Sequence, residues 1–241
     1  MTTDRPIIFS APMIRALLAG RKTQTRRILK PQPPEWATFC QQPSMYNVEH
    51  RWVPSGLWRW SEPEQSPRRA LREWPVDADG EHYWLRLPYA KGDRLYVREA
   101  WAPLDALTHN DPGATALIER GFYRADDSTV EGEISRWRPS IHMPRWASRL
   151  TLIVTDVRVE RLNAMSAADA IAEGIQDLCT PEHRDFGIPG LVNAQHPVRA
   201  FWLLWEHING AGSWDANPWV AAISFTVHRA NIDALGIARA G

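Results

Sequence analysis

This 241-residue sequence has only two cysteines and no excess of either charge. The two cysteines, Cys40 and Cys179, lie far apart and form no CxxC pair, so the sequence predicts neither a disulfide framework nor a zinc site. A reducing, cytoplasmic setting fits this usage best, and we expect a cytoplasmic protein. The 28 basic and 28 acidic side chains cancel, which excludes a uniformly basic nucleic-acid coat and an acidic disordered tail.

Long apolar runs and the common enzyme motifs are also absent. No stretch approaches the roughly 20 apolar residues that a membrane-spanning helix needs, and residues 1–13 lack the pattern of a signal peptide, so we expect neither secretion nor membrane insertion. The sequence contains no GxGxxG, Walker A, HExxH or GxSxG motif. Its eight histidines are scattered without metal-ligand spacing, and we expect no metal and no other cofactor.

Tryptophan and proline are plentiful instead. The 13 tryptophans indicate a core with polar partners for indole N–H groups, a stacking surface, or both. Prolines interrupt residues 31–90, and polar and turn-forming residues dominate residues 102–137, so both ranges are predicted to be loop-rich insertions with at most short strands. We expect one domain over residues 1–229, followed by a loosely held tail at 230–241.

Six segments carry the periodicity or capping signals of regular structure. They are helices at 10–20, 166–174 and 197–210, and strands at 92–101, 150–162 and 219–228. The apolar residues of the second strand change face near Val154, which indicates a bulge or burial on both sides. Because helices and strands do not alternate as βαβ units, we predict an α+β fold, a small mixed β-barrel with short helices at its mouth.

The charge is balanced over the whole chain but not locally. Residues 1–34 contain seven basic side chains and one acid, Asp4, and a second basic run at 134–151 is interleaved with tryptophan. If the two runs meet in space, they form an anion-binding face; two separate solvated surfaces are an equally good interpretation.

Glu99 is the most unusual residue of the strand predicted at 92–101. It shares a face with Leu95, Val97 and Trp101, and a carboxylate on an apolar face must be paired or hydrogen-bonded. A functional role and a buried salt bridge to an arginine both remain open.

Several of these segments together resemble a known family. A short apolar helix ends in GRKTQTRR at 20–27, GDRLYVREAW follows at 92–101, a helix ends in AEG at 172–174, and an aromatic strand closes the chain. This order resembles the ASCH family, whose domains have a PUA-like β-barrel and whose helix-Gly-x-Lys-Thr signature corresponds to Gly20, Lys22 and Thr23. The chain also looks like the larger ASCH-related proteins of phages and prophages, although the two insertions have no counterpart in the family core.

The resemblance implies a chemistry and three residues that perform it. Small bacterial members are amidohydrolases that remove the acetyl group of N4-acetylcytidine with a lysine, a threonine three residues later, and a glutamate of a later short helix. These match Lys22, Thr25 and Glu173, with the threonine as nucleophile, the lysine as its base, and the glutamate orienting the lysine or protonating the leaving amine. A regular strand would point Lys22 and Thr25 to opposite faces, so this chemistry requires a turn after Gly20.

Two alternatives stay open beside an N4-acylcytidine amidohydrolase, and the sequence does not decide whether the chain is an enzyme. One is a non-catalytic reader of RNA or another single-stranded nucleic acid with a modified base. The other is a ribonuclease, for which the sequence offers no histidine pair or acidic cluster. We expect a modified nucleoside or RNA as ligand, and the insertions could deepen a small-molecule pocket or dock a phage or host protein. The candidate binding residues are Arg21, Arg26, Arg27, Glu99, Trp101, His142, Arg145 and Trp146.

Overall fold

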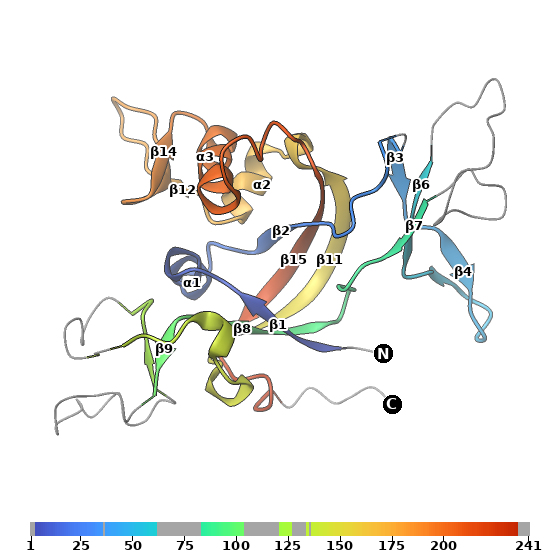
Figure 1. The fold of residues 1–241 in the computed structure, drawn as a ribbon, viewed down its shortest axis with the longest axis horizontal. Coiled ribbons are helices and arrows are strands. Elements are labelled where there is room, and N and C mark those ends of the chain that lie inside the picture. The colour runs from blue at the N-terminus through green and yellow to red at the C-terminus, as the bar shows by residue number, and fades with distance from the viewer. Residues whose placement is uncertain are drawn as a thin grey trace.

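A mixed five-stranded sheet forms the centre of the protein (Figure 1). The computed structural model describes residues 3–35, 37–61, 83–103, 121–126, 134 and 136–235. In sheet order, the strands are β1 (Asp4–Ile8), β8 (Arg94–Arg98), β11 (Thr151–Arg161), β15 (Trp219–His228) and β2 (Gln24–Ile28). β1 runs parallel to β8, and the other neighbours are antiparallel.

The predicted α+β class is confirmed, but the sheet is open. β1 and β2 are its two edges, and within the described residues the strand pairing stops there, so the ladder does not close into a barrel. Among the described residues, the two edge strands are not hydrogen-bonded to each other. The helix α1 (Ala11–Leu18) lies between them along the chain. The bulge predicted in the long strand is confirmed, because the register of β11 against β15 shifts between Val154 and Asp156.

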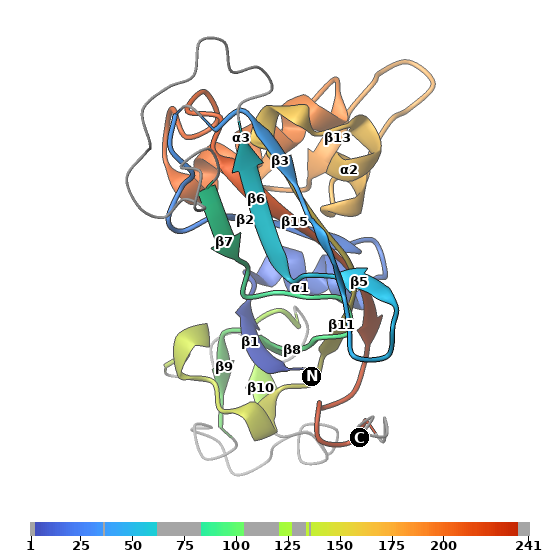
Figure 2. The ribbon, with the colours of Figure 1, turned by 90° about the vertical axis from the view of Figure 1, so that its right-hand side faces the viewer.

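The three helices begin where the capping signals indicate. Ser10 precedes α1 and Pro12 lies in its first turn. α2 (Ala167–Ala172) opens with a capping box, in which Ser166 and Asp169 satisfy each other's backbone N–H groups. α3 (Pro197–Asn209) buries Ala200, Phe201, Leu204 and Trp205, leaves Ile208 exposed, and ends at Gly210. Figures 1 and 2 both place α2 and α3 together at one end of the molecule.

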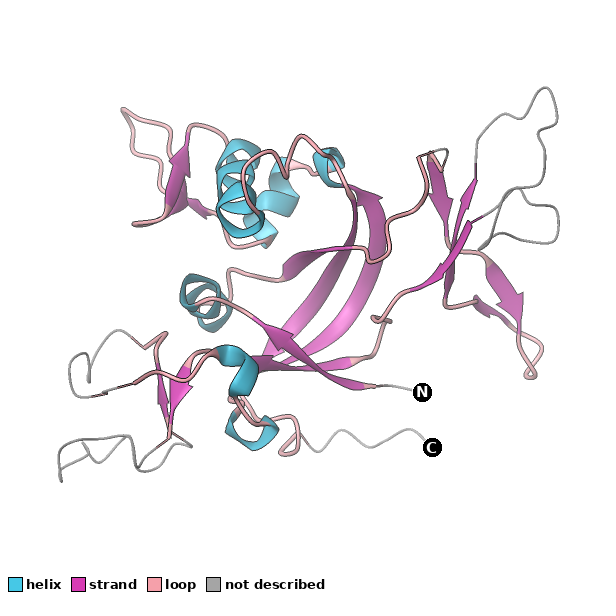
Figure 3. Ribbon diagram, in the orientation of Figure 1, coloured by secondary structure: helices cyan, strands magenta, loops and turns pink. Residues whose placement is uncertain are grey.

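Strands predominate over helices in the described chain (Figure 3). The insertion at 31–90 contains the predicted short strands, in a three-stranded sheet and a hairpin. They are β3 (Phe39–Gln41), β6 (Leu57–Ser61) and β7 (Tyr83–Arg86), and β4 (Ser44–Tyr46) with β5 (Trp52–Pro54). In the insertion at 102–137, the hairpin of β9 (Trp101–Ala102) and β10 (Phe122–Tyr123) is described. The rest of that range lies largely outside the described residues.

Short elements complete the fold. Single 3-10 turns occur in η2 (Ser140–His142), η3 (Arg145–Ala147) and η4 (Leu162–Ala164). A small sheet beside α3 consists of β12 (Gln176–Asp177), β13 (Phe186–Ile188) and β14 (Val192–Ala194). None of the described helices has both the length and the apolarity to span a lipid bilayer.

The main hydrophobic core lies between the central sheet and the helices. It contains residues of β8, β11, β15, α1 and α3, and Trp58 and Trp60 of β6 extend it into the first insertion. One core therefore joins the insertion to the central sheet.

The segment after residue 229 begins differently from the loosely held tail that we expected. Asn231 and Ile232 are buried, and the side-chain amide of Asn231 donates to the carbonyl oxygens of Arg145 and Ser148 at 2.9 and 2.7 Å. The carboxylate of Asp233 accepts from Arg145. A side chain that satisfies two backbone carbonyls fixes its segment, so residues 231–233 are held against the loop before β11. Residues 236–241 lie outside the described part.

Candidate active site

A cleft of about 530 Å³ lies between α1, β2 and α3. Part of its lining is apolar, and α3 contributes four of these residues: Phe201, Leu204, Trp205 and Ile208. The polar lining includes Lys22, Thr25, Arg26, Arg27, Lys30 and Glu173. The three residues proposed for amide hydrolysis thus line a single cavity, together with two of the eight candidate binding residues.

Lys22 reaches this cleft because the chain breaks after α1. Gly20 has a φ of 71°, a conformation that ends the helix, and the backbone N–H groups of Arg21 and Lys22 both donate to the carbonyl of Ala16. The backbone N–H of Thr23 then donates to Ala172 at the end of α2, at 2.8 Å. The turn that the chemistry requires is therefore present, and regular strand geometry begins only with β2.

Lys22 and Glu173 form a buried ion pair. The distance between Nζ of Lys22 and Oε2 of Glu173 is 2.6 Å, and Nζ also donates to the backbone carbonyl of Glu173 at 2.8 Å. Only 1% of Lys22 and 3% of Glu173 is exposed. Gly174 makes room for this approach: with a φ of 107°, its added Cβ would lie 3.2 Å from Ala16 and 3.5 Å from the Cβ of Lys22.

The environment of Lys22 lowers the pKa of its ammonium group. Burial lowers the pKa of the Lys22 ammonium, the attraction of Glu173 opposes this shift, and the cations Arg27 and Arg26 lower the pKa further. The net direction is a pKa below the ordinary lysine value. A desolvated lysine of this kind can act as a base.

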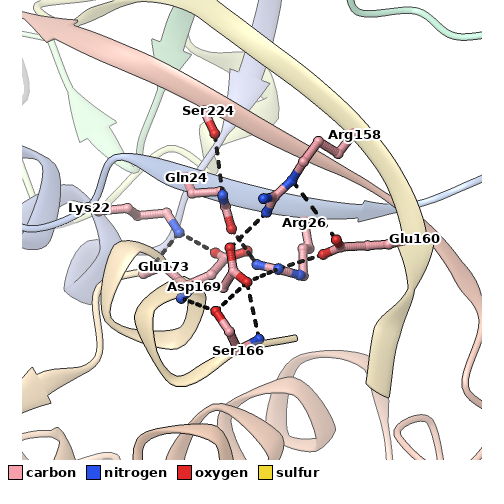
Figure 4. A network of polar contacts seen from close by, with 9 residues as sticks. All are labelled: Lys22, Gln24, Arg26, Arg158, Glu160, Ser166, Asp169, Glu173 and Ser224. Carbon is pink, nitrogen blue, oxygen red and sulfur yellow. Dashed lines mark hydrogen bonds and ion pairs between the residues drawn. The ribbon is translucent and has the colours of Figure 1, made fainter. Parts of the chain in front are cut away.

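Arg26 connects the ion pair to a larger charged network (Figure 4). Its buried guanidinium lies 2.6 Å from Oε1 of Glu160, 3.5 Å from Oδ2 of Asp169 and 3.5 Å from Oε1 of Glu173. It also donates to the amide oxygen of Gln24 at 2.5 Å. Because one rigid guanidinium contacts carboxylates of β11, α2 and the residue after α2, it fixes the Glu173 carboxylate relative to the sheet.

Asp169 anchors the outer side of this network. Burial acts to raise the pKa of its carboxyl, but hydrogen bonds from Ser166 and Arg158 outweigh burial and the pKa is lowered. The distance from Arg158 Nη2 to Asp169 Oδ1 is 2.7 Å. The same carboxylate thus caps α2 and supports the network that holds Glu173.

Thr25 lies in β2, opposite Ile223 of β15, and is 4% exposed. Its hydroxyl makes no hydrogen bond to another side chain within the described residues. Because Lys22 lies in the turn before β2, the two side chains line the same cleft instead of opposite faces of one strand.

Arg27 and Lys30 contribute further positive charge. Nη2 of Arg27 donates to the carbonyl of Ile8 at 2.8 Å, and its guanidinium lies 5.2 Å from the ring centroid of Phe9. Lys22 Nζ lies 5.5 Å from the same ring. Lys30 belongs to the first basic run but was not among the candidate site residues, and no apolar residue of α3 was a candidate either. Nothing in the local pattern distinguishes a core face from one that also lines a cleft.

Glu99 lies outside this cleft and is held by a salt bridge. It follows β8 directly, is 1% exposed, and receives two hydrogen bonds from the guanidinium of Arg149 at 2.9 and 3.0 Å. Arg149 also pairs with Asp126 at 2.6 Å. Of the two interpretations left open by the sequence, the structure therefore shows the buried salt bridge.

The remaining candidate residues also lie away from the cleft. Trp101 is buried and meets the half-exposed Trp146 edge to face at 5.7 Å between ring centroids. Arg145 pairs with Asp4 at 2.7 Å and with Asp233 at 2.6 Å. His142 is exposed in η2, and Arg21 does not line the cleft. The sequence left open whether the two basic runs form one anion-binding face or two separate surfaces, and no described residue of 134–151 lines this cleft.

The described side chains form no group of three or more histidine, cysteine, aspartate or glutamate residues that could hold a metal ion. Cys40 is unpaired and half-buried, and burial raises the pKa of its thiol to about 12.

Comparison of the chain with models of protein families, with curated proteins and with solved structures found no match. The resemblance to the ASCH family therefore rests on the sequence motifs alone.

Proposed function

We propose that the cleft is the active site of an ASCH-type, PUA-like hydrolase that cleaves the amide bond of an N4-acylated cytidine. The observation that carries this proposal is the meeting of Lys22, Thr25 and Glu173 in one cavity. Lys22 and Glu173 are 151 positions apart in the chain, yet their charged atoms are 2.6 Å apart and buried. An ion pair that only stabilised the fold would not need a threonine hydroxyl and an apolar cleft lining beside it.

The buried pair can supply both a base and an acid. A proton moves from Nζ of Lys22 to Oε2 of Glu173, which leaves a neutral amine and a carboxylic acid; burial, which lowers the pKa of the Lys22 ammonium, assists the loss of this proton. The amine takes the proton of the Thr25 hydroxyl while that oxygen bonds to the acyl carbon, whose carbonyl oxygen becomes an oxyanion. Arg26, which lines the same cleft, stabilises the developing negative charge.

The intermediate then collapses and the enzyme is restored. The C–N bond breaks, N4 takes the proton of the Glu173 carboxylic acid, and cytidine leaves an acyl ester on Thr25. After a proton again passes from Lys22 to Glu173, the Lys22 amine deprotonates a water that attacks the ester. Glu173 protonates the departing Thr25 oxygen, so one water is consumed and one carboxylic acid is released.

The test is an assay of the purified protein on N4-acetylcytidine and N4-acylated cytosines. We expect Lys22→Ala, Thr25→Ala and Glu173→Gln each to lower kcat by about 10²–10⁴, the usual loss for a missing acid, base or nucleophile partner. Lys91→Ala is the matched control, because Lys91 is exposed and does not line the cleft. Full activity in Lys22→Ala and Glu173→Gln would refute these roles. No turnover combined with salt-sensitive RNA binding would favour the non-catalytic reader instead.

A further inference from the structure

The charge of the cleft is strongly unequal. Its lining contains four cationic side chains and a single carboxylate, Glu173. Lys22 and Arg26 have carboxylate partners within 2.6 Å. Arg27 and Lys30 have none among the described residues, and this leaves two uncompensated cations at the cleft. Such a cleft concentrates anions.

The guanidinium of Arg27 is held in place and keeps N–H groups that are free to donate. Nη2 is fixed on the carbonyl of Ile8 at 2.8 Å, which places the guanidinium beside the turn between β1 and α1. Its Nε–H is buried and has no hydrogen-bond partner among the residues that the structure describes. A planar guanidinium with unused N–H groups matches the oxygens of a phosphate.

The start of α1 adds to this positive region. Ser10 lines the cleft at the N-cap of α1, and its hydroxyl does not cap the helix. The end of a helix that carries unpaired N–H groups favours a negative group. Arg27, Lys30 and the N-terminus of α1 therefore line the same cavity as the apolar residues of α3.

We propose that the substrate of this cleft is a phosphorylated cytidine, a nucleotide whose phosphate binds Arg27 and Lys30 while the base lies against α3. The inference rests on the proposed function for the identity of the base. The cleft volume of about 530 Å³ is that of a small-molecule pocket, for which roughly 300–1,000 Å³ is usual, and this favours a mononucleotide over a nucleic-acid strand.

Equilibrium binding of cytidine, cytidine 5′-monophosphate and a short oligocytidylate to the wild-type protein tests the inference without catalysis. We expect the monophosphate to bind at least about tenfold more tightly than cytidine, the usual gain from a charge-assisted hydrogen bond. Lys30→Ala and Arg27→Gln should each remove most of that preference and leave cytidine binding unchanged within about twofold. Lys91→Ala and Arg51→Ala remove exposed cations away from the cleft and should keep the preference for the monophosphate. Thermal melts confirm that each variant is folded.

Equal affinity for cytidine and its monophosphate would overturn the inference, and so would tighter binding of the oligonucleotide than of the monophosphate. Turnover of N4-acetylcytidine with and without a 5′-phosphate separates this result from the proposed function. Equal kcat/KM for both compounds would support the hydrolase and overturn the phosphate site. Lys30-dependent binding of the monophosphate without turnover of either compound would support the phosphate site and overturn the hydrolase.

Discussion

Replacing Lys22 with methionine should destabilise the protein by about 3–5 kcal/mol, the usual result of removing one partner of a buried ion pair. Methionine is nearly as long as lysine and fills the same space, so the loss is chiefly electrostatic. The carboxylate of Glu173, which is 3% exposed, would lose a cation at 2.6 Å and keep only Arg26 at 3.5 Å. Because Arg26 still compensates part of the charge, we expect the lower end of this range.

A double-mutant cycle isolates the interaction itself. Glu173→Gln alone leaves the Lys22 cation buried beside a neutral amide and near Arg26 and Arg27, which lower its pKa. The double variant Lys22→Met/Glu173→Gln removes both charges, so its destabilisation should be smaller than the sum of the two single effects by roughly 1–3 kcal/mol.

Urea unfolding followed by tryptophan fluorescence provides the assay. Equal slopes of the unfolding free energy with denaturant would show that the variants unfold between comparable states. Asp233→Asn is the control, because the side chain of Asp233 is 60% exposed in its pair with Arg145, and such a pair contributes at most about 1 kcal/mol. Additive effects in the Lys22 and Glu173 cycle would refute the buried pair.

Three further predictions concern the surroundings of the site. Gly174→Ala should cost about 1–3 kcal/mol, because alanine is strained at a φ of 107° and its Cβ would lie 3.2 Å from Ala16; an unchanged urea midpoint would contradict this. Asn231→Ala should cost about 1–3 kcal/mol, because buried carbonyls such as that of Ser148 lose their donor, and hydrogen exchange at residues 230–235 should accelerate. The pKa of Asp169 is lowered in the folded state, so its contribution to stability is present above about pH 4 and lost as the pH falls through the folded pKa. Thermal melts between pH 2 and 7 should show a shallower acid loss in Asp169→Asn, and equal slopes would exclude this role.

The elements predicted from sequence are those with local signals. Capping residues and apolar periodicity indicate all three helices, and runs of β-branched residues indicate β11 and β15. β1 was not predicted, because it is a short, mostly exposed edge strand with Pro6 inside it. Its pairing with β8 joins residues 90 positions apart, and no local pattern carries that information. The open edges of the sheet are likewise a property of the assembled fold.

The site was only partly predictable for the same reason. All three catalytic candidates were inferred from the family resemblance. Lys22 and Thr25 match a local motif at 20–27, whereas the match of Glu173 depends on an alignment across both insertions. The network around Arg26 could not be predicted, because Glu160 lies on β11 and Asp169 on α2, and neither position looks unusual in its own segment. The tertiary structure decides which charged side chains form ion pairs, and the amino-acid composition does not contain that information.

The two insertions relate to the core and to the cleft in different ways. Among the described residues of 31–90 and 102–137, Tyr89 alone lines the cleft, whereas Trp60 is fully buried in the main core. The β4–β5 hairpin, with Trp52 73% exposed, lies on the side of the molecule away from α3 (Figure 1). If the insertions dock a phage or host protein, binding at this hairpin would leave the cleft open. Partner binding and turnover should then be separable: removing the indole of Trp52 would weaken association while kcat/KM stays unchanged.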